Sequence, residues 1–240
     1  SRLVAVLIGT DHAASSADAA ATSAIRFALA ADMCRLSPRF GNPWLEFHPL
    51  FRDGLRRRLE REESQEALAS LHTCVAEWLE ADALHDAAIG HWLAAGEHDA
   101  AIALVEQAIQ PAFDREDWAA VARWLALLPD DVVWGRLPLL LAKGWIAHLR
   151  GRSTQLMEIV RGIEARLAQD DLPEAERLAL RAELDLLVQG STLPVQFDPA
   201  RSLVVAQEAL ARVSAERRYQ QGLAWTLLGM ALQSTGHGDT

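Results

Sequence analysis

The sequence predicts a mainly helical protein in which a small N-terminal module, residues 1–62, precedes an array of helix pairs, residues 63–240. Ala and Leu dominate the composition and both favour helix, whereas Tyr occurs once, which argues against a large sheet. Residues 47–53 join a strand-like stretch to a continuous helical period. Further along, Gly residues that end predicted helices recur roughly every 40 residues, as in helical-repeat proteins.

Composition limits the class of partner. The formal net charge of −10 repels phosphate backbones, so direct DNA binding by this chain as a whole is not expected. Cys34 and Cys74 stand alone and far apart, which favours a reduced, cytoplasmic setting. No apolar run approaches the roughly 20 residues of a membrane span. The chain begins without Met and stops at Thr240, where an array would continue, so we expect a fragment of a longer protein.

The N-terminal module combines short segments of different types. The apolar run Leu3 to Ile8 is either a strand or a buried helical turn, and residues 15–32 form an Ala-rich helix with Ser or Asp as its N-cap. Gly41-Asn42-Pro43 marks a turn, and the flanking residues alternate, with Trp44 and Glu46 facing away from Leu45 and Phe47. A β-hairpin after helices predicts a winged-helix-like module.

From Pro49 onward the pattern is helical. Helices are expected at about 50–62 and 64–81, followed by two short helices that share the pentapeptide His-Asp-Ala-Ala-Ile and are separated by the helix stop Gly96. Pro111 is expected to break the next helix, and Asp114 or Asp117 to cap its successor. The predicted apolar stripes of the first two helices comprise Leu50, Phe51, Leu55 and Leu59, then Leu68, Leu71, Val75, Trp78 and Leu79.

The C-terminal half continues this pattern. Helices are predicted at residues 137–150, 153–169, 173–189, 199–214 and 217–235. Gly151, Gly190 and Gly236 are each expected to end one of them. The period predicts a TPR-like solenoid of helix pairs, with an irregular helical domain as the alternative.

Motifs for catalysis are missing from the sequence. Lys143, the only Lys, lies in an apolar helix and outside any phosphate-binding P-loop, and the hydrolase and zinc-protease signatures are absent. The spacing of His72, Cys74 and the later His residues is poor for zinc, so these residues are interpreted as helix-surface groups. The chain is therefore not predicted to be an enzyme.

Two further groups of side chains have competing interpretations. A basic run on one helix is either a phosphate contact or a solvated face balanced by nearby Glu residues; it comprises Arg52, Arg56, Arg57, Arg58 and Arg61. The Trp residues mostly belong to apolar stripes, although Trp92, Trp134 and Trp145 could line a concave groove.

Three stretches carry a family resemblance. The residues Phe47-His48-Pro49-Leu50-Phe51-Arg52-Asp53 resemble a motif of the maltose-regulator type of LuxR-family transcriptional activators. The stretches 78–96 and 124–142 resemble later motifs of the same family, in the same order. These activators are large ATP-dependent regulators of the signal-transducing STAND class.

The resemblance implies an ATPase domain, then a winged helix, then a helical sensor of an inducer, then a DNA-binding helix-turn-helix. This chain would hold only the middle parts, and ATP or ADP would bind elsewhere in the full-length protein. His48 falls where such winged helices place a His near the bound ADP phosphate, and Arg52 is the accompanying candidate contact. The alternative for His48 is that it only orders the corner before Pro49.

Two functions follow as expectations. The first is a regulatory segment that couples an unknown inducer or regulatory protein on the helical array to an absent ATPase domain. The second is a stand-alone TPR-like scaffold that binds a protein or peptide.

Overall fold

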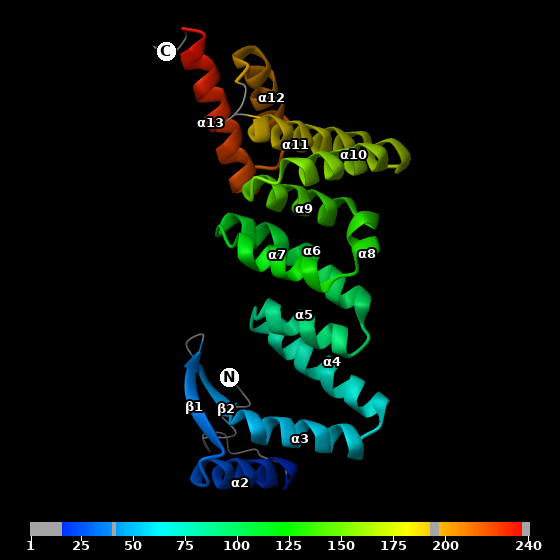
Figure 1. Ribbon diagram of the computed structural model, residues 1–240, viewed down its shortest axis with the longest axis vertical. Helices are drawn as coiled ribbons and strands as arrows, with labels where there is room; N and C mark the ends of the chain where they lie inside the picture. The colour runs from blue at the N-terminus through cyan, green and yellow to red at the C-terminus, as the bar shows by residue number, and fades with distance from the viewer. Residues whose placement is uncertain (1–15, 40–41, 193–196, 237–240) are drawn as a thin grey trace. The chain divides into compact units, whose positions relative to one another are not determined.

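The computed structural model describes residues 16–39, 42–192 and 197–236 (Figure 1). The chain divides into two compact units, Ser1–Leu68 and Ala69–Thr240, and each is considered by itself. The predicted apolar segment Leu3 to Ile8 lies outside the described residues. Most of the described chain is helical, which confirms the predicted helical class.

The described residues of the first unit form α2 (Ser16–Ala30), a β-hairpin of β1 (Cys34–Arg39) and β2 (Asn42–Phe47), and α3 (Pro49–Glu62). The strands are antiparallel, with Cys34 opposite Phe47, which confirms the predicted hairpin. The backbone N–H of His48 donates to the carbonyl of Met33 at 2.8 Å, so the pairing extends one residue beyond the strands. Pro49 at the first helical position then starts α3, because its fixed φ suits a helix. An N–H at this position would have no acceptor within the helix, so its absence costs nothing.

The predicted apolar face of α3 differs from expectation, because no residue of this helix is buried. Leu50 is 75% exposed, and Leu55 and Leu59 are also exposed. Five Arg residues on the same 14-residue helix explain part of this, since their charged heads hold α3 at a solvated surface.

The second unit is a succession of helices, and most of them pack on a neighbour in sequence, as α5 does on α6 and α12 on α13 (Figure 1). The helix α4 begins in the last residues of the first unit. The helices are α4 (Gln65–Ala81), α5 (His85–Ala94), α6 (His98–Asp114), α7 (Trp118–Leu127), α8 (Asp130–Gly135), α9 (Leu137–Leu149), α10 (Ser153–Gln169), α11 (Glu174–Thr192), α12 (Pro199–Arg212) and α13 (Arg218–Ser234).

The core of the second unit is centred on α9. This helix contacts α6, α7 and α8 as well as α10 and α11, and it is buried on nearly every face. Leu139, Leu140 and Trp145 have almost no exposed surface. Each such side chain contributes about 1.5–3 kcal/mol by leaving water, so burial of α9 stabilises this unit. The predicted stripe of α4 is only partly buried: Leu79 is inside, whereas Leu71 and Val75 are exposed.

Several helix ends in the second unit share one backbone geometry. Gly96, Gly151 and Gly236 adopt positive φ just after their helices, as predicted for helix stops. Ala83 and Glu116 adopt the same conformation with φ of 57° and 58°. The bonds Ala83 N–H to Glu80 O and Leu84 N–H to Leu79 O, both 2.9 Å, close the end of α4 in the Schellman pattern. Sequence reasoning missed the non-Gly ends because it relied on Gly as the signal.

Two predicted helix ends are wrong. Gly190 lies inside α11. A β-carbon there would come within 3.1 Å of Leu223 and 3.6 Å of His148, so the missing side chain lets neighbouring helices approach. Pro111 lies inside α6, which continues to Asp114. Pro111 has no N–H, so α6 lacks one intrahelical hydrogen bond at this position. The last turn is nevertheless packed, because Ala112 and Phe113 are buried. The short helix α8 was not anticipated.

Candidate functional site

The first unit has a shallow pocket of about 450 Å³ at the corner between the hairpin and α3. His48 and Arg52 both line it, together with Cys34, Phe47 and residues of the strand β1. His48 is exposed, and its carbonyl accepts the backbone N–H of Arg52 at 2.9 Å, which sets the two side chains one helical turn apart. The structure therefore brings together the two residues singled out from sequence, and their contact with nucleotide stays a prediction.

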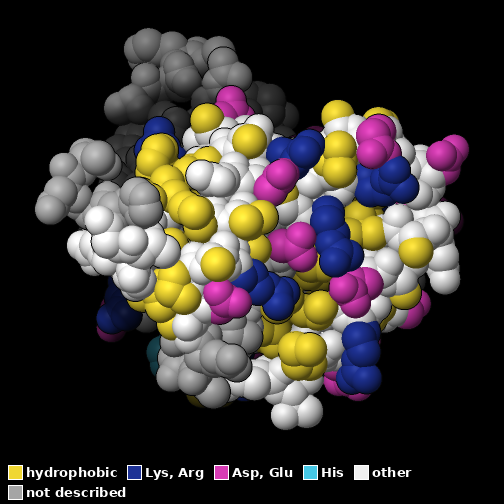
Figure 2. Space-filling view, turned by 90° about the horizontal axis from the view of Figure 1, so that it is seen from above, with side chains coloured by type: hydrophobic (Ala, Val, Ile, Leu, Met, Phe, Trp, Pro, Cys, Tyr) yellow, Lys and Arg dark blue, Asp and Glu magenta, His cyan; other side chains and the backbone are white. Residues whose placement is uncertain are grey.

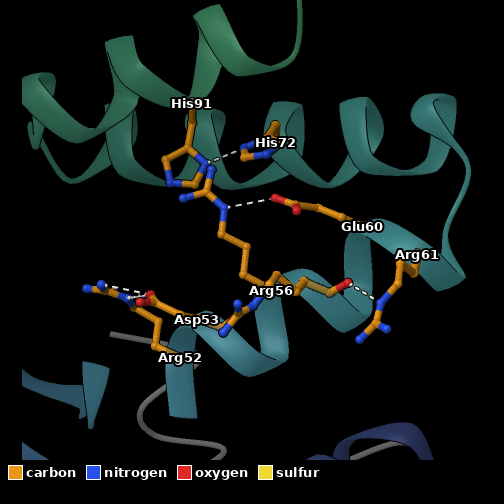
Figure 3. Close-up of polar contacts among 8 residues, drawn as sticks. Arg52, Asp53, Arg56, Glu60, Arg61, His72 and His91 are labelled. Carbon is orange, nitrogen blue, oxygen red and sulfur yellow. Dashed lines mark hydrogen bonds and ion pairs between the residues drawn. The ribbon is translucent and has the colours of Figure 1, made fainter. Parts of the chain in front are cut away.

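Three of the five Arg residues of α3 pair with a nearby acidic side chain. Arg56 pairs with Glu60 at 3.1 Å and Arg58 with Glu62 at 2.8 Å, both at helical i,i+4 spacing. Arg52 pairs with the neighbouring Asp53 at 3.0 Å (Figure 3). All of these pairs are exposed, and such pairs contribute little to stability. The geometry favours the solvated-face interpretation of the basic run.

The second unit has a larger groove of about 560 Å³. Its lining comes from α6, α9, α10 and α11 and from the connection between α12 and α13, which are far apart in sequence. The apolar part includes Phe113, Leu137, Leu141, Trp145 and Val213. Trp145 confirms part of the predicted groove, whereas Trp92 and Trp134 are not among its lining residues.

A buried carboxylate lies in the wall of this groove. Glu183 of α11 is 3% exposed. It accepts hydrogen bonds from Trp145 Nε1 at 3.0 Å and Gln220 Nε2 at 3.2 Å, and it forms an ion pair with Arg217. These partners lie on α9, on α13 and just before α13, so one carboxylate joins three separate elements. Burial raises the pKa of Glu183, and the charge of Arg217 with the three hydrogen bonds opposes that rise.

The rim of the groove carries charges of both signs. Arg136 lies 3.5 Å from Glu106, and Arg166 lies 3.3 Å from Asp170 and donates to the carbonyl of Gly135 at 2.7 Å. Figure 2 shows how basic and acidic side chains interleave with hydrophobic ones on one face of the molecule. The groove thus combines an apolar floor with paired polar groups, which is the usual composition of a small-molecule or peptide site.

Sequence reasoning missed two features: the buried Glu183 and a pair of His residues. A lone Glu on an amphipathic helix is normally a surface residue, and nothing in the local pattern marks its burial. His72 and His91, interpreted as surface residues on separate helices, lie with their Nδ1 atoms 2.9 Å apart (Figure 3). Their sequence separation of 19 carries no recognisable spacing signal.

Comparison with known proteins identifies partial relatives. The chain is 31% identical to the HTH-type transcriptional regulator MalT of Yersinia enterocolitica over 186 residues, which is 78% of this chain and 20% of that protein. It is 25% identical to MalT of Cronobacter sakazakii over 195 residues, which is 80% of this chain and 21% of that protein. It is 34% identical to the serine/threonine-protein kinase PknK of Mycobacterium tuberculosis over 144 residues, which is 60% of this chain and 13% of that protein.

The chain therefore has a low-identity relationship to part of MalT-type regulators, and it spans about a fifth or less of the curated relatives described above. No family model matches it, and no solved structure matches it. Across the described ranges, every helix is too short or too polar to cross a membrane.

Proposed function

We propose that this chain is the regulatory segment of a LuxR-family, STAND-class transcription regulator. In this proposal the second unit is a TPR-like receptor for an inducer or a regulatory protein. The first unit is a winged-helix-like module that contacts an ATPase domain elsewhere in the same cytoplasmic protein. The chain performs no catalysis and does not bind DNA directly.

The relationship to two kinds of protein supports a receiving role. The stretches matched by MalT and PknK overlap, because together they exceed the length of the chain. One relative is named as a transcription regulator and the other as a kinase, so their outputs differ. A segment common to both is better explained as a part that receives or relays a signal than as the part that binds DNA or transfers phosphate.

The observation that carries the proposal is the groove around Glu183. A ligand bound there would touch α6, α9, α11 and the connection before α13 at once. Binding that prefers one arrangement of these helices shifts their equilibrium by the difference in affinity. The groove therefore has the properties needed to convert binding into a change of packing.

Substitution of an exposed groove residue tests this function in the full-length protein. Glu176 of α11 lines the groove and is exposed, so Glu176→Trp fills the groove without disturbing the core. Glu158 of α10 is also exposed but is not a lining residue, so Glu158→Trp is the matched control. We expect the Glu176 variant to reproduce the transcript profile of a gene deletion, or of constitutive activation, at unchanged protein level. A wild-type profile for the Glu176 variant would contradict the groove as the receiving site.

Nucleotide coupling is tested separately at His48. An imidazole and a guanidinium on one pocket are suitable donors to phosphate, so we propose that His48 and Arg52 face the ADP held by the ATPase domain. His48→Ala in the full-length protein should lower the amount of ADP that copurifies, or make activity constitutive, whereas the exposed His98→Ala should not. Unchanged ADP and unchanged inducer dependence would remove the switch role from His48.

The alternative function is a stand-alone TPR-like scaffold. One observation favours it: the groove is formed entirely by the second unit, so binding there needs no nucleotide domain. The coding sequence upstream of Ser1 discriminates the two. A P-loop ATPase supports the regulator, and a start codon supports the scaffold.

A further inference from the structure

Two imidazole rings meet near the beginning of the second unit. His72 of α4 and His91 of α5 are both partly buried, and their Nδ1 atoms lie 2.9 Å apart. The ring centroids are 4.9 Å apart and the planes are inclined by 45° (Figure 3). The pair joins two successive helices, which are also linked by the hydrogen bond from Trp92 Nε1 to Glu80 at 3.0 Å.

The short distance between the two Nδ1 atoms allows two kinds of interaction, a hydrogen bond or a shared cation. In the neutral pair one Nδ1 carries a hydrogen and donates it to the other. If both rings carry their hydrogen on Nε2 instead, both Nδ1 lone pairs are available to one cation. This exchange moves one hydrogen from Nδ1 to Nε2 within a ring, so a neutral pair binds a metal ion without net loss of protons. Because 2.9 Å leaves no room for an ion between the two nitrogen atoms, the cation would lie to one side of the line that joins them. Neutral imidazole is the common protein ligand for Zn²⁺, Cu²⁺ and Ni²⁺.

The separation of the nitrogen atoms favours particular ions. Two nitrogen ligands bound at about 2.1 Å lie about 3.0 Å apart when the angle at the metal is a right angle, and about 3.4 Å apart when it is tetrahedral. The observed 2.9 Å fits the right angle. Cu²⁺ and Ni²⁺ adopt square-planar or tetragonal coordination by nitrogen, whereas Zn²⁺ prefers the tetrahedron.

We propose that His72 and His91 form a binding site for a divalent transition-metal ion of the Ni²⁺ or Cu²⁺ type, which fastens α4 to α5. The described residues contain no group of three or more His, Cys, Asp or Glu side chains placed around a metal, so water completes the coordination. Two protein ligands and several waters make an exchangeable site.

The site has a measurable consequence for stability. An ion that binds the folded helix pair and not the unfolded chain raises the unfolding temperature in proportion to the logarithm of its concentration over Kd. Zn²⁺ should bind more weakly than Ni²⁺, because the nitrogen atoms must separate by about 0.5 Å to reach the tetrahedral angle.

Calorimetric titration of the tag-free chain with NiCl₂ tests the site, alongside His72→Ala, His91→Ala and the control His98→Ala. We expect one Ni²⁺ per chain and a rise in unfolding temperature. The affinity for Ni²⁺ should fall at least tenfold in each of the first two variants, and the rise in unfolding temperature should shrink with it. Both effects should persist in the control. The absence of saturable binding by the unaltered chain would overturn the site. So would binding by the His72 or His91 variant that equals binding by the unaltered chain.

Electron paramagnetic resonance of Cu²⁺ bound to the unaltered chain provides a readout that does not depend on whether a variant folds. Hyperfine structure from two imidazole nitrogen atoms is expected. A signal without two such nitrogen atoms would overturn the assignment. Neither measurement depends on the proposed regulatory function, so the metal site can be refuted while the regulatory function stands, and the reverse.

Discussion

The buried Glu183 network gives the sharpest test of the structure. Glu183→Ala removes the acceptor of Trp145 Nε1 and Gln220 Nε2, which are both buried and would lose their partner. A buried donor left unsatisfied costs about 1–3 kcal/mol. The Arg217 side chain is 35% exposed and reaches water, so its loss of partner adds less. The two unsatisfied donors therefore set the expected cost of Glu183→Ala at about 2–6 kcal/mol.

Glu183→Gln separates shape from charge. The amide keeps an oxygen for Trp145 and removes a buried charge whose desolvation is unfavourable, so a change of about 1 kcal/mol or less is expected at neutral pH. Urea unfolding of the whole chain, followed by circular dichroism at the helix band, measures both variants. A cost below about 1 kcal/mol for Glu183→Ala, or equal costs for the two variants, would refute the reasoning.

The same residue predicts a pH dependence. Its pKa is raised in the folded state, so the folded chain holds this proton more strongly than the unfolded chain. The stabilisation that the proton provides is fully present below the unfolded pKa of Glu, and it is lost as pH rises through the folded value. The free energy of unfolding of Glu183→Gln should therefore rise relative to that of the unaltered chain as pH increases from about 4 upward. A difference that is flat or falls with pH would contradict the raised pKa.

Two further predictions concern backbone conformation and helix contact. Ala83→Gly and Glu116→Gly should each raise the free energy of unfolding by about 0.5–1 kcal/mol, because Gly adopts their positive φ without steric cost; a loss of stability on thermal unfolding would contradict this. Gly190→Leu should lower the free energy of unfolding by about 1–3 kcal/mol through overpacking against Leu223. Gly229→Leu is the control, because nothing lies within 4 Å of a β-carbon there, and it should be neutral or stabilising by up to about 1 kcal/mol. Equal effects in urea unfolding would contradict the close approach at Gly190.

Local pattern was sufficient for most of the helices. The bounds of α9, α10, α12 and α13 lie within about two residues of the predicted ranges, because apolar period, Gly stops and Pro or Asp starts all operate within a few residues. The hairpin was also predictable, since alternation and a turn cluster are short-range signals. His48 was singled out by the family resemblance and Arg52 by the same motif and the basic run, and the structure places both on one pocket.

Other features depended on contacts between segments far apart in the chain. Gly190 has the sequence signature of a helix end, and only the approach of Leu223 and His148 explains its place inside α11. Glu183 resembles any solvated Glu until α9 and α13 cover it. His72 and His91 carry no shared spacing, because the turn between α4 and α5 decides which faces meet.

The sequence by itself determined the helical class, the hairpin and the bounds of several helices, because hydrogen bonding within a helix and amphipathic period are local properties. The tertiary structure alone decided which polar groups are buried and which side chains share a groove. Burial and pairing energies are set by the neighbours that packing supplies, and those neighbours lie tens of residues away along the chain.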